Sequence, residues 1–230
     1  CRSGEYEGLE EKLKDPQWKP DYGPSVFEKS VPKSGATAIA ARDFLVAYNI
    51  NLNTTSTRRA NAVAFDLREA GRLKRKGNKL TGAVEKDAHG EPIRIAGHFK
   101  NLKGIGWFIK DYGIAQISYN LTNIQTTPLH KVFEKTCERA EIRGLRVTGS
   151  ELVGLVPKKV LLDAGVYFLR KQQRSTALAD SEIIRIAVKT LGLDELKPFI
   201  AEEQILESFL DKETSELDQL KNTDLNSKIN

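Results

Sequence analysis

The most regular alternation of apolar and polar residues in the chain runs over residues 42–52. Its even positions are apolar or aromatic from Phe44 onward, and its odd positions end in Ala47, Asn49 and Asn51. Alternate side chains of a β-strand point to opposite faces of a sheet, so one face would enter a core and the other would present amides. Asparagine is depleted in strands, so two of them on one face indicate that this face has a role of its own.

The same two-faced pattern returns over residues 104–121, which predict two strands around a turn at 110–113. In the second of these strands Gln116, Ser118 and Asn120 alternate with apolar residues. This alternation again predicts one apolar face and one hydrogen-bonding face.

Residues 146–153 predict a fourth strand. We expect Thr148 and Ser150 on its hydrogen-bonding face. By alternation, the carboxylate of Glu151 should point the other way or lie at the strand end.

Helical spacing of apolar residues lies between and after these strands. One helix has candidate caps at 54–56 and ends at Gly71, a second begins at Thr127 and Pro128, and three more follow Pro157. The order β-α-β-β-α-β, then helices, predicts an α+β fold of the ferredoxin-like, split βαβ type. We expect a four-stranded sheet with helices on one face, plus extra C-terminal helices.

Polar residues from three of the strands would then share the face that the helices leave open. Amides and hydroxyls without charges suit a neutral heteroaromatic ligand or a hydrated interface, although an ordinary solvent-exposed sheet face also carries polar residues. The residues expected there are Asn49, Asn51, Gln116, Ser118, Asn120, Thr148 and Ser150.

Two segments lack a regular period. Residues 15–37 are rich in proline and glycine, and their aromatic residues Trp18, Tyr22 and Phe27 indicate an arm that lies against a surface. Residues 73–103 are a polar, glycine-containing insertion, and its KDAHGE portion has the turn chemistry of a small hairpin.

Composition describes an ordinary globular protein, with 40% hydrophobic and 29% charged residues in 230. No apolar run approaches the roughly 20 residues of a membrane-spanning helix, and the start of the chain has no signal-peptide pattern. The only cysteines are Cys1 and Cys137, and Cys137 is expected as a small buried hydrophobe. We therefore expect a cytoplasmic protein. Because the sequence contains no methionine, we also expect a fragment whose N-terminus lies upstream.

The net charge of +5 is unevenly spread, with many Lys and Arg residues between 58 and 110. The densest run, at 72–76, suits either a solvated loop or a surface that attracts nucleic acid or a small polyanion.

Candidate catalytic residues are scarce. His89, His98 and His130 are far apart and have no metal-ligand spacing with Cys, Asp or Glu. His130 reads as a packed structural residue, and no nucleophile elbow, P-loop or dinucleotide motif is present. The pair Gly104 and Gly106 would either let a ligand approach the backbone or shape the entry of a strand. The residues alone thus predict a binding surface without a catalytic set.

Several long motifs resemble glutamate formiminotransferase, the folate-dependent enzyme of histidine degradation. The resemblance runs in register from about Arg2 to Phe209, and it is carried by RSGEYEGLEEKL, DPQWKPDYGPS, ARDFLVAYNINLNT, GIGWFI, AQISYNLT and GSELVGLVPKKVLLDA. It implies a transferase that moves the formimino group of N-formimino-L-glutamate to N5 of tetrahydrofolate. It also implies two α/β subdomains with folate in a tunnel between them, small-molecule substrates, no metal, no nucleic acid or membrane partner, and a homodimer as a candidate assembly.

The resemblance makes the irregular arm a folate-binding segment that begins at GPS and ends at a glycine before the first strand. Residues 28–30 look like a short insertion within it. Together with the open face, the folate-binding residues expected are Gly23, Pro24, Ser25, Val31, Pro32, Gly35, Asn49, Asn51, Gln116, Ser118 and Asn120.

The family's general acid/base histidine has no match in this chain and is expected upstream of it. The resemblance thus divides the chain into residues 1–41, the end of an N-terminal subdomain with the arm, 42–212, a C-terminal formiminotransferase subdomain, and 213–230, a polar tail. Such a chain is expected to be inactive alone. The 73–103 insertion is more basic than the family pattern, and its Lys74, Arg75 and Lys76 would attract the glutamate tail of the cosubstrate.

Two other functions remain open from the residues. A ferredoxin-like sheet with a basic flank suits RNA, and the aromatic residues that could stack on bases are Trp107, Tyr48 and Tyr119. Tyr48 and Tyr119 fall by alternation on the helix-covered face, so the pattern gives a stacking platform little support. Such a sheet also suits a structural or dimerisation domain that pairs through its open face.

Overall fold

The computed structural model of the chain describes residues 8–37, 39, 41, 43–77 and 81–215. The chain forms two compact units, Cys1–Asp43 and Phe44–Asn230, each described here by itself. The first unit contains α1 (Leu9–Lys12), the 3-10 helix η1 (Pro16–Trp18) and α2 (Val31–Ser34). Only short helices form there because proline and glycine interrupt every longer run, as expected for the arm.

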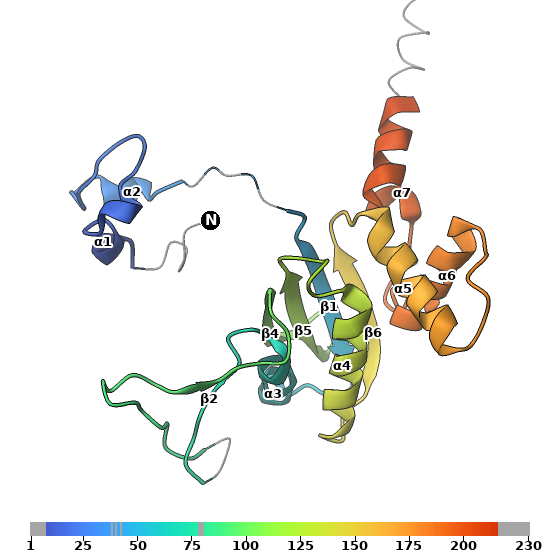
Figure 1. The fold of residues 1–230 in the computed structure, drawn as a ribbon, viewed down its shortest axis with the longest axis horizontal. Helices are drawn as coiled ribbons and strands as arrows, with labels where there is room; N and C mark the ends of the chain where they lie inside the picture. Colours follow the sequence, from blue (N-terminus) through green and yellow to red (C-terminus); the bar gives the residue numbers. More distant parts are fainter. Residues whose placement is uncertain (1–7, 38, 40, 42, 78–80, 216–230) are drawn as a thin grey trace, which may run out of the picture. The chain divides into compact units, whose positions relative to one another are not determined.

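The second unit is built on one antiparallel sheet in the order β4-β5-β1-β6 (Figure 1). With α3 between β1 and β4, and α4 between β5 and β6, the chain follows the predicted split βαβ order. The fold class predicted from the sequence is therefore confirmed. The strands are β1 (Val46–Leu52), β4 (Leu102–Ile109), β5 (Ile114–Leu121) and β6 (Val147–Val153).

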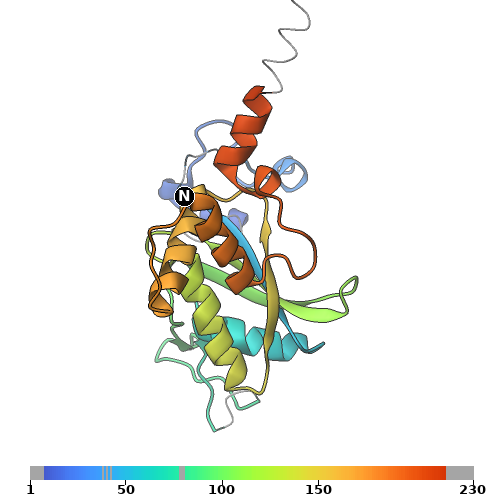
Figure 2. The same cartoon turned by 90° about the vertical axis from the view of Figure 1, so that its right-hand side faces the viewer.

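Helices cover one face of this sheet, where α3 and α4 contact its strands (Figures 1 and 2). Further along the chain, α5 packs on α4 and α6 packs on α5. None of the helices in the described residues is long and apolar enough to cross a membrane. The helices are α3 (Thr57–Leu67), α4 (Leu129–Glu141), α5 (Lys158–Lys171), α6 (Asp180–Leu191) and α7 (Ala201–Gln204).

The core lies between the sheet and these helices. The apolar positions of β1 from Val46 to Leu52 are all buried there, as their alternation predicts. The strand begins at Val46 and not at residue 42, so Phe44 lies outside it and is 57% exposed. Likewise, α3 ends at Leu67, earlier than the glycine at 71 predicted.

The insertion forms a small β-structure of its own. Its first and last strands, β2 (Arg72–Leu73) and β3 (Arg94–Ile95), pair antiparallel. The turn predicted in KDAHGE is present, because the Asp87 carboxylate accepts hydrogen bonds from the backbone N–H groups of His89 and Glu91 at 2.8 and 2.9 Å.

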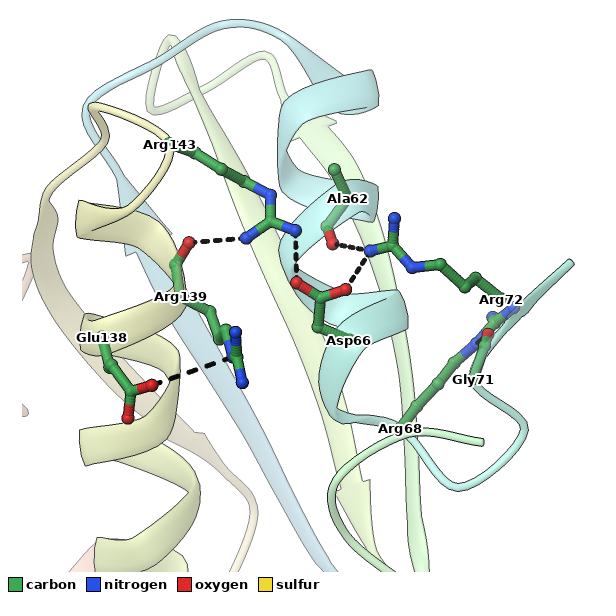
Figure 3. A network of polar contacts seen from close by, with 8 residues as sticks. All are labelled: Ala62, Asp66, Arg68, Gly71, Arg72, Glu138, Arg139 and Arg143. Carbon is green, nitrogen blue, oxygen red and sulfur yellow. Dashed lines mark hydrogen bonds and ion pairs between the residues drawn. The ribbon is translucent and has the colours of Figure 1, made fainter. Parts of the chain in front are cut away.

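Asp66 of α3 joins three parts of the second unit (Figure 3). Its carboxylate accepts hydrogen bonds from Arg72, at the start of the insertion, and from Arg143, just after α4. Arg72 also donates to the carbonyl oxygen of Ala62 at 2.8 Å, and Arg143 donates to that of Arg139 at 2.9 Å. These contacts fasten the base of the insertion and the end of α4 to the same helix.

β4 is an outer strand of the sheet, and α3 closes its free edge. A Cβ atom at Gly106 would lie 2.5 Å from the backbone nitrogen of Asn61, so only glycine lets the helix come this close. The Gly106 N–H donates to Asn61 Oδ1, and Asn61 Nδ2 donates to the Gly106 carbonyl, both at 3.0 Å. Arg68 donates to the Gly104 carbonyl at 3.2 Å. Gly106 therefore serves the packing of α3, and Gly104 leaves room for the Tyr119 ring, which a Cβ atom at Gly104 would approach to 2.7 Å. At both glycines the close approach is made by the protein itself.

Candidate functional site

The face of the sheet opposite α3 and α4, called here the open face, carries the predicted polar residues of two central strands. Asn51 lies opposite Gln116, and Asn49 lies opposite Ser118, across the β1–β5 pair. Residues directly opposite each other in an antiparallel pair share a face, so these four side chains form one patch. Asn120 belongs to it too, opposite Ala47.

A hydrogen-bonded network crosses this patch from one edge of the sheet to the other. Trp107 Nε1 on β4 donates to Gln116 Oε1 at 3.3 Å. Gln116 Nε2 in turn donates to Asn51 Oδ1 at 2.8 Å and to Glu151 Oε2 at 2.9 Å. The amide of Gln116 therefore has one possible orientation, with its oxygen toward the indole and its nitrogen toward the carboxylate.

The structure reverses the prediction for the fourth strand. Ser150 lies opposite Ile50 on the helix-covered face, where it accepts a hydrogen bond from the Tyr48 hydroxyl at 2.9 Å and donates to the Leu191 carbonyl. Burial raises the pKa of Tyr48 and keeps its hydroxyl protonated. A buried tyrosine hydroxyl needs a partner, and this requirement places a serine in the core.

Glu151 consequently lies on the open face, opposite Asn49, and not on the other side as its position in the pattern predicted. Thr148 has no register partner in β1, because the register shifts between Asn51 and Leu52. The spacing of Thr148 from Ser150 therefore does not determine on which face of the sheet the Thr148 side chain lies. A carboxylate is thus part of a patch that the sequence predicted to be uncharged.

The centre of the patch is well shielded, although α3 and α4 pack on the opposite face of the sheet. Asn49 is 6% exposed, and Asn51 and Gln116 are 0% and 1% exposed. Asn51 Nδ2 is buried without a hydrogen-bond partner in the described residues. A buried donor without a partner costs about 1–3 kcal/mol, so the central amides are not explained by stability alone.

A segment that passes around β6 also reaches this face. A Cβ atom at Gly149, the register partner of Asn51, would lie 2.5 Å from Cβ of Glu195. The stem of Glu195 thus lies beside Gly149, on the same face of the sheet as Asn51. Periodicity could not reveal this contact, because residue 195 lies outside every regular element.

None of the three histidines has a part in this network. His130 is stacked on Tyr167 with ring centroids 4.5 Å apart, and burial lowers its pKa. His98 lies edge-on to Phe99, and His89 is exposed in the turn of the insertion. The structural interpretation of His130 is therefore confirmed.

Two cavities lie near chemistry-bearing side chains. One of about 810 Å³ lies on the helical side, bordered by Phe133, Cys137 and Lys171 among others. Cys137 is half-buried, and burial raises the pKa of its thiol to about 11. The other, of about 340 Å³, lies beside β6 and is lined by Glu151 and Glu203, so it adjoins the open face.

The arm residues predicted to bind folate belong to the first unit. Gly23 and Gly35 both have positive φ angles, 89° and 66°, which only glycine adopts readily. Pro24, Ser25 and Pro32 are exposed, whereas Val31 is 6% exposed. Among the described residues, no group of three or more His, Cys, Asp or Glu side chains could hold a metal ion.

Comparison with known proteins adds to this geometry. The sequence model of the "Formiminotransferase domain" matches residues 47–211, and that of the "Formiminotransferase domain, N-terminal subdomain" matches residues 1–42. The chain is 44% identical over 206 residues to formimidoyltransferase-cyclodeaminase of Gallus gallus and 45% identical to that of Sus scrofa, covering 90% of this chain and 34% of each relative. It is also 37% identical over 166 residues to glutamate formimidoyltransferase of Thermoplasma acidophilum, covering 72% of this chain and 45% of that relative.

The chain spans about a third of the length of the formimidoyltransferase-cyclodeaminases that it matches. The domain match nevertheless covers most of the chain, with the same strands that carry the open face. The chain therefore belongs to the formiminotransferase family.

Proposed function

We propose that this chain is the folate-binding part of a glutamate formimidoyltransferase. In that reaction N5 of tetrahydrofolate forms a bond to the formimino carbon of N-formimino-L-glutamate, and the bond from that carbon to the glutamate nitrogen breaks. The names of the relatives support the reaction class. The observation that carries the proposal is the network of Trp107, Gln116, Asn51 and Glu151 on the sheet face opposite α3 and α4.

This network supports folate because a reduced pterin is a neutral ring with several hydrogen-bonding atoms. Shielded amides hold such a ring through directional contacts, and an exposed indole offers it an apolar surface. Ser118 and Asn120 are half-buried next to the central amides, which leaves their polar groups accessible. We propose these residues as the part of the folate site that the sheet contributes.

We propose that the arm contributes the rest of that site, through Gly23, Pro24, Ser25, Val31, Pro32 and Gly35. Positive φ angles at its two glycines support a backbone that presents N–H and carbonyl groups to a ligand. In this proposal the arm ends at residue 41, the formiminotransferase subdomain is 42–212, and 213–230 is a tail.

The chain's own histidines receive no role in proton transfer, since none of them contacts the network. We place the protein in the cytoplasm, with folate and formiminoglutamate as small-molecule partners, no metal, and a homodimer as its assembly. An RNA-binding sheet is less well supported, because the tyrosines Tyr48 and Tyr119 are completely buried.

Calorimetric titration with 5-formyltetrahydrofolate tests the proposal. We would titrate the chain alone and the chain joined to the N-terminal subdomain of the Gallus gallus relative. We expect binding in at least the joined protein, and a loss of about tenfold or more for Gln116→Ala, which removes the central member of the network. Binding in neither protein, or a gel shift with RNA that weakens with salt, would refute the proposal.

A further inference from the structure

The contacts of Glu151 single it out among the side chains of the open face. One of its carboxylate oxygens, Oε2, accepts the hydrogen bond from Gln116 Nε2 at 2.9 Å. The other oxygen accepts no hydrogen bond from the described residues, and the side chain is only half-buried. Glu151 is therefore a carboxylate held in place by one oxygen, with the other available to a ligand.

Its neighbour across the β1–β6 pair is Asn49, whose amide makes no hydrogen bond with the described residues either. Directly opposite residues have Cβ atoms about 4.5–5.5 Å apart. The open face thus presents a carboxylate acceptor and an amide side by side on neighbouring strands. Glu195 also reaches this face, but it is exposed and has no hydrogen bond to the network.

The orientation of Glu151 is set from the opposite edge of the sheet. Trp107 Nε1 donates to Gln116 Oε1, so the donor end of the Gln116 amide must face β6. This donor then holds the carboxylate. Trp107 and Gln116 are thus arranged to position Glu151. A glutamate that only faced solvent would not need such positioning.

The proposed function indicates which groups of a ligand Glu151 and Asn49 would contact. The 2-amino-4-oxo edge of a reduced pterin has two adjacent donors, N3–H and the 2-amino group, followed by an acceptor, the 4-oxo oxygen. The free oxygen of the Glu151 carboxylate complements one of the two donors, and Oε2, which keeps a second lone pair beside its hydrogen bond from Gln116, complements the other. An amide N–H beside the carboxylate complements the oxo group. We propose that Glu151 accepts hydrogen bonds from the 2-amino and N3–H groups of the pterin and that Asn49 donates one to its 4-oxo oxygen. This inference rests on the folate site proposed above.

The test compares two ligands, 5-formyltetrahydrofolate and its analogue without the 2-amino group. Titrations would use whichever of the two proteins above binds folate. The unchanged protein should bind the complete ligand about 10- to 100-fold more tightly than the analogue, as expected for a charge-assisted hydrogen bond. Glu151→Gln should lose most of this preference, while its amide oxygen still accepts from Gln116 and preserves the fold. Asn49→Ala should weaken both ligands equally.

Glu203→Gln is the matched control, because Glu203 lines the same cavity as Glu151 but lies on α7 and makes no contact with Gln116. It removes the same charge and should leave the preference unchanged. A Glu151→Gln protein that binds folate and keeps the full preference would overturn the inference while the proposed function stands. If neither protein binds 5-formyltetrahydrofolate, the proposed function fails, and the inference fails with it.

Discussion

Replacing Asn61 by alanine tests how α3 closes the edge of the sheet. The substitution removes both 3.0 Å hydrogen bonds between the Asn61 amide and the backbone of Gly106. It also removes a contact from Asn61 Nδ2 to the carbonyl of Thr57 at 3.0 Å, which matters less because that carbonyl keeps its helical environment. Gly106 is buried, so its N–H and carbonyl groups would lose their partners away from bulk water.

The size of the expected loss of stability follows from the N–H and carbonyl groups of Gly106. Leaving a buried backbone group unpaired costs about 1–3 kcal/mol, so two of them cost about 2–4 kcal/mol if some water enters the space left by the amide. Alanine is a better helix former than asparagine and returns about 0.5 kcal/mol. We therefore expect Asn61→Ala to lower the free energy of unfolding by about 1.5–3.5 kcal/mol.

Urea denaturation followed by circular dichroism measures this change, with the slope m as a check that the same surface is exposed. Arg58→Ala on the exposed side of the same helix is the control and should change stability by less than about 0.5 kcal/mol. If the two variants unfold at the same urea concentration, the amide of Asn61 does not close this edge. A companion variant, Gly106→Ala, should also destabilise, because its Cβ would lie 2.6 Å from Cβ of Ala60.

Three further predictions concern other parts of the second unit. Trp107→Phe should weaken 5-formyltetrahydrofolate binding about three- to tenfold by calorimetry, because it removes the donor that orients Gln116, and unchanged affinity would contradict that role. Neutralising Lys74, Arg75 and Lys76 together should weaken the binding of polyglutamylated folate more than that of the monoglutamate, although Lys74 already pairs with Glu85 at 2.8 Å. Equal losses of affinity for the two ligands would show that these residues do not bind the glutamate tail. Burial lowers the pKa of His130 in the folded chain. As pH falls below about 6.5, this histidine therefore takes up a proton more readily in the unfolded chain than in the folded one. Stability should therefore decline from pH 7.5 to pH 5.5, and His130→Phe, which retains the stack on Tyr167, should show a smaller decline in urea denaturation.

Period-two patterns predicted the two central strands well, because each has one continuous apolar face. The alternation in β1 and β5 was sufficient to bring Asn49, Asn51, Gln116, Ser118 and Asn120 to one face. In β6 the same reasoning failed, since a serine there serves a buried tyrosine and a glutamate occupies the polar side. Polarity alone does not tell a core hydroxyl from an exposed one when its partner lies 102 positions away in the chain.

Contacts between distant segments were also beyond the sequence patterns. The pair Gly104 and Gly106 suggested a close approach, but nothing local identified α3 as the approaching element. The position of Glu195 beside Gly149 depends on an irregular segment whose sequence has no period. Such contacts follow from how elements pack, which periodicity does not describe.

Each outer strand of the sheet has backbone groups on its free edge that are hydrogen-bonded within the second unit. On β4, Gly106 bonds with Asn61 of α3 and the Gly104 carbonyl accepts from Arg68, and on β6 the Ser150 N–H donates to the Gly192 carbonyl at 2.9 Å. Edges whose backbone groups are partly occupied in this way are a poorer template on which a newly made or partly folded neighbour could add a strand. A module of this kind can be joined to other modules in one polypeptide with less risk of strand exchange.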